Sequence, residues 1–220
     1  MGGVRSRLRQ DGVTNRAALA LGAWLVVGCI ATPVVAQQRA ATDASAATDA
    51  SLNEQIRRRA RIAVVHRAMG ITTWASLAAT TTWGTLRYAN VVGFGQPLCA
   101  AGGSPIFGRD FGCGAGLRIW HLVSASFTTL SYAATRILAL LMPDPYADAD
   151  SSDTPFGRRL AWHRILSWAH LVGMIAMPVL GLAVSETDPG AARDVFAVAH
   201  LVTGYATFAA LSAAALLMLF

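Results

Sequence analysis

Four long apolar segments dominate the pattern of hydrophobic and polar positions from residue 62 onward. They run from Ile62 to Leu86, Leu117 to Met142, Leu160 to Val184 and Val195 to Phe220. Each is long enough to cross about 30 Å of hydrocarbon as a helix. The segments lack the period-2 alternation of a β-barrel, and in lipid only helices or closed barrels satisfy the backbone. The pattern therefore predicts an all-α protein, an integral membrane four-helix bundle over residues 62–220.

The intervening stretches have the composition of loops. Residues 93–116 are rich in glycine and contain two prolines, residues 143–157 contain three prolines and four aspartates, and residues 185–194 contain the sequence Asp-Pro-Gly. Glycine and proline at this density interrupt helices. We therefore expect successive apolar segments to run in opposite directions.

The first 61 residues follow a different pattern. Four arginines precede an apolar stretch at 17–36 that ends in Val34-Val35-Ala36, as a signal peptide does. We predict a signal peptide over residues 1–36, with an extra hydrophobic helix as the alternative. The repeat Ala-Thr-Asp-Ala-Ser then indicates a polar linker over residues 37–61.

Composition supports the membrane assignment. The 220 residues are 54% hydrophobic and 14% charged, whereas about a quarter of residues are charged in soluble domains. All eighteen basic residues are arginine and the net charge is +6. Because the arginines flank the apolar segments, we expect the partner to be the lipid bilayer and no nucleic acid. The predicted location is a bacterial-type inner (cytoplasmic) membrane, crossed several times.

Every histidine of the chain lies inside an apolar segment. The five are His66, His121, His163, His170 and His200, with at least one in each segment. Ionisable side chains are costly inside a membrane, so this distribution indicates a function. The structural alternative is that the imidazoles only form hydrogen bonds between helices.

Antiparallel helices bring the histidines together in pairs. His66 can meet a histidine of the third segment, and His121 can meet His200, so two bis-imidazole pairs would lie at two depths. Neutral imidazole nitrogens from facing helices are axial ligands of haem iron. The expected cofactor is haem b, with two haems per chain.

The third segment leaves the choice of ligand open. His163 and His170 are seven residues apart, so they share a face and differ in depth by about 10 Å. A short internal repeat, in which His66-Arg67 matches His163-Arg164, favours His163 as the partner of His66. Depth in the apolar core, and the glycine at position 173, favour His170. We give a slight preference to His170.

Three arginines lie within three residues of a histidine. Arg67, Arg118 and Arg164 stand at the depth where haem propionates would need cationic partners. These are the candidate cofactor-binding residues. The alternative is that they extend to the membrane surface without binding a cofactor.

One histidine per helix on four successive segments, with short motifs such as His66-Arg-Ala-Met-Gly and His170-Leu-Val-Gly, resembles the cytochrome b561 group of membrane cytochromes. The resemblance covers residues 62–220. It implies two b-type haems, one between the first and third helices and one between the second and fourth, with electrons passing across the membrane. The implied ligands are His66 with His170 or His163, and His121 with His200. The family's substrate-binding basic residues have no counterpart here.

Two observations on orientation disagree. A signal peptide would place the linker outside the cytoplasm, whereas the linker side carries nine arginines against four on the other side, which places it inside. Cys99 and Cys113 form a disulfide or remain free thiols, and a disulfide would require their loop to face an oxidising compartment. The orientation stays open at this point.

The sequence therefore predicts a di-haem electron carrier, acting as a transmembrane oxidoreductase between a quinol or small-molecule donor and an acceptor that the residues do not identify. The alternative is a membrane anchor or assembly subunit of a larger respiratory or photosynthetic complex, in contact with other membrane subunits. A proton-coupled transporter is less favoured because the four segments contain no carboxylate.

Overall fold

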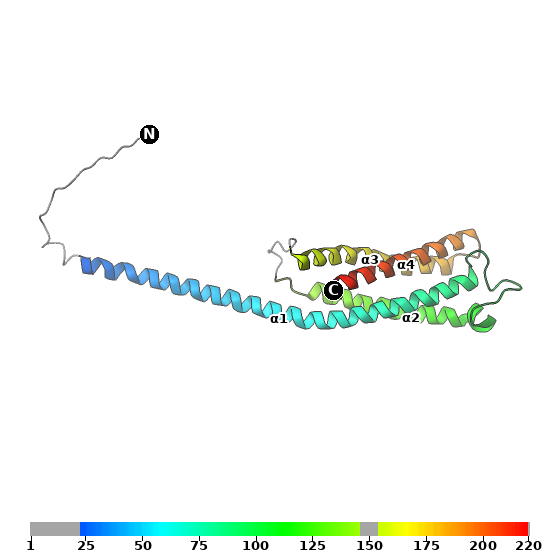
Figure 1. Cartoon of the computed structure of the whole chain (residues 1–220), viewed down its shortest axis with the longest axis horizontal. Coiled ribbons are helices and arrows are strands. Elements are labelled where there is room, and N and C mark those ends of the chain that lie inside the picture. Colours follow the sequence, from blue (N-terminus) through cyan, green and yellow to red (C-terminus); the bar gives the residue numbers. More distant parts are fainter. Residues whose placement is uncertain (1–22, 146–153, 220) are drawn as a thin grey trace, which may run out of the picture. The chain divides into compact units, whose positions relative to one another are not determined.

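The computed structural model describes residues 23–145 and 154–219, and every regular element within them is helical (Figure 1). The helices are α1 (Ala23–Val91), a π-helical turn η1 (Arg109–Cys113), α2 (Ala115–Leu141), α3 (Pro155–Glu186) and α4 (Ala191–Leu219). The all-α prediction is confirmed. The four predicted apolar segments correspond, within a few residues, to the last part of α1 and to α2, α3 and α4.

By length and composition, two of the described helices are candidates to cross a membrane. These are α3 and the Ala191–Met218 portion of α4. The prediction that α1 and α2 also cross the membrane stays a prediction.

Helix α1 is longer than the apolar segment it contains. It also includes residues 37–61, which the sequence pattern indicated as a linker. The Ala-rich composition of this stretch explains the helix, because alanine has the highest helix propensity. Its side chains from Ser45 to Arg58 are almost all exposed, so it buries no apolar face. Residues 1–22 of the predicted signal peptide lie outside the described residues.

The chain divides into two compact units, Met1–Glu54 and Gln55–Phe220. Within the second unit, contacts between side chains show the direction of each helix. Thr73 contacts Ser131 on α2, and further along α1 Thr80 contacts Thr128, so α1 and α2 are antiparallel. The same holds for α3 and α4, because the start of α3 contacts the end of α4. The predicted alternation of direction is confirmed.

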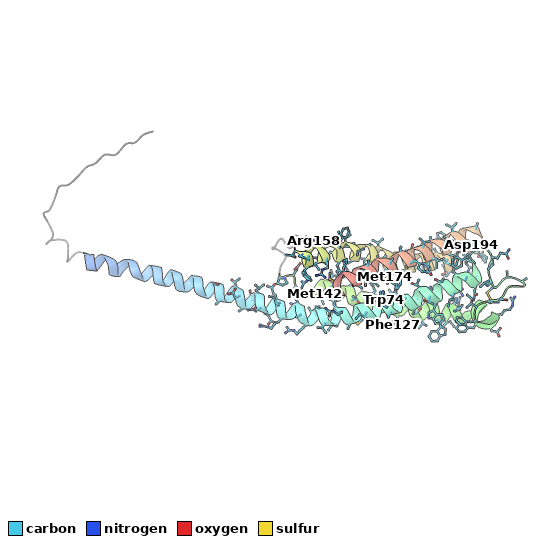
Figure 2. All side chains as sticks on the ribbon, in the orientation of Figure 1. Trp74, Phe127, Met142, Arg158, Met174 and Asp194 are labelled. Carbon is cyan, nitrogen blue, oxygen red and sulfur yellow. A yellow bond between two sulfur atoms is a disulfide. The ribbon has the colours of Figure 1, made fainter. Side chains whose placement is uncertain are left out.

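The four helices of this unit contact one another around a ring. Trp74 of α1 donates to Ser212 of α4 at 2.9 Å, and Tyr132 of α2 bonds to His170 of α3 at 2.9 Å. Helices α1 and α3 therefore lie diagonally opposite each other, as do α2 and α4. The hydrophobic centre contains Leu77, Tyr132 and Met174, and Figure 2 labels Met174 among the helices.

Polar and small side chains bring these helices close. A Cβ added at Gly173 of α3 would lie 2.0 Å from the hydroxyl of Thr207, so α3 and α4 approach too closely for a larger residue there unless Thr207 moves. Threonine hydroxyls that bond between α1 and α2 also bond back to their own helices. Close backbone approach through small residues is typical of helix packing in lipid.

One end of the second unit is closed by a disulfide, and we call it the disulfide end. Cys99 and Cys113 are bonded, with Cα atoms 5.8 Å apart. The fully buried amide of Asn90 donates to the carbonyls of Ile106 and Gly112 and accepts from the Ile106 N–H. The disulfide and this amide together fix the loop between α1 and α2.

Candidate functional site

Three of the five histidines make the same contact with a neighbouring helix. Nδ1 of His66, His121 and His163 lies 2.9 to 3.1 Å from the main-chain carbonyl oxygen of Thr135, Thr80 and Ala214 respectively. A carbonyl only accepts hydrogen bonds, so each Nδ1 carries the proton and donates it. The Nε2 of each ring is then left with a free lone pair. Metal-binding imidazoles are oriented in this way by their second nitrogen.

These contacts repeat at constant spacing. His66 and His163 are 97 positions apart, and His121 and His200 are 79 positions apart. The acceptors Thr135 and Ala214 are also 79 positions apart. The contacts between α1 and α2 therefore recur between α3 and α4, which supports the helix-pair duplication suggested by the short sequence repeat.

The fourth contact of this pattern is incomplete. The acceptor of His121 is Thr80, and the residue 97 positions later is Met177. His200 does interact with the backbone of Met177, but without the geometry of a full hydrogen bond. Its buried Nδ1 therefore has no bonded partner among residues 23–145 and 154–219.

His121 and His200 meet across the diagonal between α2 and α4. Their ring centroids are 6.0 Å apart and the ring planes are at 83°. Two imidazoles on one metal ion have centroids about 6 Å apart, because each metal–nitrogen bond is about 2 Å and each nitrogen lies about 1 Å from its ring centre. The predicted juxtaposition of these two rings is confirmed, and their centroid separation is close to this value.

A glycine lies against each ring of this pair. A Cβ added at Gly84 of α1 would lie 2.9 Å from Cε1 of His121, and one added at Gly181 of α3 would lie 3.3 Å from Cε1 of His200. The two glycines are again 97 positions apart. Each ring therefore occupies space that a larger residue on the facing helix would fill.

At the opposite end of the unit, His66 lies on α1 and His163 lies on the diagonal helix α3. Each is half-buried. Their Nδ1 atoms are held by carbonyls of α2 and α4, the helices between them. Each of these two rings is therefore oriented by a hydrogen bond to a main-chain carbonyl, as the ring of His121 is.

His170 has different surroundings. It is buried, and its Nδ1 lies 2.9 Å from the hydroxyl of Tyr132, with ring centroids 5.5 Å apart. The position 97 residues earlier is occupied by Thr73, so His170 has no counterpart in the first half. Its partner Tyr132 is a residue that the sequence analysis did not select.

The three candidate arginines do not gather at one place. Arg164 donates to the carboxylate of Asp144, which also forms an ion pair with Arg59 at 3.7 Å. Arg67 is exposed on α1, and Arg118 is exposed at the start of α2, on the helix that carries His121.

The donor set suits haem better than a bare metal ion. Among the residues described, no three His, Cys, Asp or Glu side chains come together to hold a metal. Haem iron needs only axial ligands from the protein, since the macrocycle supplies the other four. The facing imidazoles of His121 and His200 could supply two such ligands, and the Nδ1–H of His121 leaves its Nε2 free.

Comparison with known family models, curated proteins and solved structures finds no match to this chain. The resemblance to cytochrome b561 therefore depends only on the histidine pattern and the short motifs quoted above.

Some residues of the site were missed by sequence reasoning. Gly84 and Gly181 could have been found from their spacing of 97, which equals that of His66 and His163. Tyr132 gave no such signal, because its contact with His170 depends on the rotation of α2 against α3.

Proposed function

We propose that this chain is a membrane electron-transfer protein that binds two b-type haems at its paired histidines. The observation that carries the proposal is the His121–His200 pair, with its 6.0 Å ring separation and a glycine against each ring.

The surface of all four helices supports a location within lipid. Large hydrophobic side chains are exposed on each helix, among them Ile71 on α1, Leu130 and Leu140 on α2, Val179 on α3 and Val202 on α4. The buried positions between the helices include Thr73, Thr80, Thr128, Ser131 and Thr207. A polar interior with an apolar exterior is favourable in hydrocarbon and costly in water. This distribution favours a four-helix bundle that spans a membrane several times, such as a bacterial-type inner membrane.

We assign one haem to His121 and His200 and the other to His66 and His163. His163 replaces His170 as the preferred ligand for two reasons. It donates Nδ1–H to a main-chain carbonyl, as His66 and His121 do, and it lies at the position that the 97-residue spacing assigns. His170 instead uses Nδ1 in its contact with Tyr132.

The histidines would ligate the iron, and the apolar residues of the helices would exclude water. A bound haem supplies one-electron redox chemistry at its iron. The carbonyls of Thr80, Thr135 and Ala214 hold three of the imidazoles in the tautomer that offers Nε2. The apolar helices keep water away from both sites, which contributes to setting the redox potentials.

A donor that reaches the protein through the membrane is supported by an open groove between α3 and α4. The groove has a volume of about 700 Å³ and an almost entirely apolar lining, formed by Arg159, Trp162, Leu166, Ala213, Leu216 and Leu217. Its size is within the range of small-molecule sites. Its lining includes Trp162, the neighbour of His163 in the sequence, so we place the quinol at this end of the unit and the acceptor at the disulfide end.

The experiment is a reduced-minus-oxidised spectrum and a haem assay on the purified full-length chain from haem-replete cells. We expect about two b-type haems per chain. His121→Ala and His200→Ala should each lose the same haem, and the double variant should lose no more than either alone. His66→Ala and His163→Ala should lose the other haem in the same non-additive way.

His170→Gln is the matched control, because it changes a buried histidine in the same helix as His163. We expect it to keep both haems. A colourless wild-type protein would contradict the proposal and would favour a role as an anchor subunit of a larger complex. Loss of a haem in His170→Gln, with His163→Ala unaffected, would reverse the ligand assignment.

A further inference from the structure

Three arginines from three helices lie at the disulfide end, beyond the His121–His200 pair. Arg87 lies one turn after Gly84 on α1, Arg118 lies one turn before His121 on α2, and Arg193 lies in the first turn of α4. Figure 2 labels Asp194, the next residue, at this end of the helices, and Met142 and Arg158 at the other.

Arg87 and Arg193 are partly buried, and Arg118 is exposed. Burial lowers the pKa of Arg87 below its usual value, and the positive charges of Arg118 and Arg193 lower it further. Like charges are therefore concentrated next to the ring pair.

Arg87 has an unpaired polar atom in the interior. Its Nη1 is buried, and it has no hydrogen-bond partner within residues 23–145 and 154–219. An unsatisfied guanidinium nitrogen is costly to bury, because it loses its water and gains no acceptor. An anion from outside the chain would supply the missing acceptor.

At the opposite end of the unit, two arginines have an acidic partner. There, Arg164 and Arg59 share the carboxylate of Asp144. In the part of the chain that the structure describes, no acidic side chain forms an ion pair with Arg87, Arg118 or Arg193. The acidic residues nearest in sequence to this end, including Asp188 and Asp194, are exposed.

We propose that Arg87, Arg118 and Arg193 form an anion site that binds a carboxylate or phosphate group beside the His121–His200 pair. Guanidinium groups bind both anions through paired, charge-assisted hydrogen bonds. The anion has one of two sources. It is a propionate of the haem, in which case the site rests on the proposed function, or it is a separate anionic molecule from the solution at the disulfide end.

The test uses the full-length protein in detergent, with Arg87→Gln and Arg118→Gln as the variants. Arg118 is exposed, so its replacement tests the site without disturbing the interior. Arg109→Gln is the matched control, because it removes the same charge from the same end. The Arg109 guanidinium donates to the carbonyls of Cys99 and Ala100 and has no role in the site.

Two measurements separate the two sources. The first is haem retained per chain after gel filtration. If a propionate fills the site, both variants should lose the haem that His200→Ala loses, with dissociation at least about tenfold faster than in wild type, and Arg87→Lys should restore most of it. The second is the thermal midpoint in inorganic phosphate against sodium chloride of equal ionic strength.

If a separate anion fills the site, phosphate should raise the wild-type midpoint by about 2–4 °C and the variants should lose this rise. This measurement also applies to a colourless protein, so failure of the haem proposal is distinguishable from failure of the anion site. The anion site is overturned if both variants match wild type and Arg109→Gln in haem retention and in the response to phosphate.

Discussion

At the scale of single residues, the space beside each imidazole controls the candidate haem site. Gly84 and Gly181 each leave room that a Cβ would take from a histidine ring, and the room is smaller at Gly84 than at Gly181. A side chain at Gly84 would therefore displace the ring of His121, and one at Gly181 would press on the ring of His200.

We expect Gly84→Val to displace the ring of His121 and to remove about one of the two haems. The added Cβ alone would lie 2.9 Å from Cε1, which is too close for a carbon contact. Haem per chain, measured from absorbance and protein concentration, checks this. Gly70→Ala on the same helix is the control, because its nearest neighbour, a methyl carbon of Thr135, would be 4.0 Å away. Unchanged haem in Gly84→Val would show that the ring does not hold iron.

Tyr132→Phe tests the role of His170 in the interior. The change removes one hydroxyl and leaves Nδ1 of a buried imidazole without its partner. The free energy of unfolding should fall by about 1–3 kcal/mol, measured in mixed detergent micelles, while both haems remain. A variant that keeps its stability and loses a haem would instead make His170 a ligand positioned by Tyr132.

At the scale of elements, the loop between α1 and α2 is held by a disulfide and, independently, by the hydrogen bonds of one buried amide. The disulfide closes a sequence separation of 14 residues, and the amide of Asn90 bonds the loop from inside. Both lie at the end of the unit that carries His121. The geometry of that site therefore depends on this loop.

Asn90→Ala should destabilise this end by about 3 kcal/mol, because two carbonyls and one N–H would lose their partner in the interior. Reduction of the disulfide should cost a similar amount, about 3 kcal/mol for a loop of this length. Hydrogen exchange of the residues that follow Cys113 provides the measurement. Equal protection in wild type, Asn90→Ala and the reduced protein would contradict this role of the loop.

The sequence predicted the existence and order of the helices better than their ends. Helix α3 begins at Pro155, five residues before the predicted start, because proline suits the first turn of a helix and the hydroxyl of Thr154 accepts from the N–H of Gly157 at 2.9 Å. The same proline indicated a loop in the sequence pattern.

The candidate site was predictable only in part, for a physical reason. Periodicity gave the face and depth of each histidine, which was enough to pair His121 with His200. It did not give the rotation of neighbouring helices, which decides that Nδ1 of His163 meets a carbonyl while Nδ1 of His170 meets Tyr132. The arginine site also depends on three helix ends meeting, so Arg87 and Arg193 could not be selected from the sequence.

At the scale of the whole molecule, the disulfide predicts which way the proposed membrane bundle is oriented. Disulfides persist in oxidising compartments, so we expect the loop that contains Cys99 and Cys113 to face the outside of the cell. This agrees with the nine arginines on the opposite side, which favour the cytoplasm.

A thiol-labelling experiment in intact cells checks the orientation. The native cysteines are first replaced by serine. In this background, Phe94→Cys should react with a membrane-impermeant maleimide. Asp144→Cys in the same background should react with the maleimide only after the cells are opened. The reverse result would place the disulfide loop in the cytoplasm.

The pairing across diagonals has a consequence for assembly. Each bis-histidine pair takes one ring from the α1–α2 hairpin and one from the α3–α4 hairpin, so neither hairpin alone has a complete site. A haem would then bind only when both hairpins are present and packed together. A chain that ends after α2 should bind no haem. Two co-expressed half-chains, divided between Met142 and Pro155, should bind haem only when they associate.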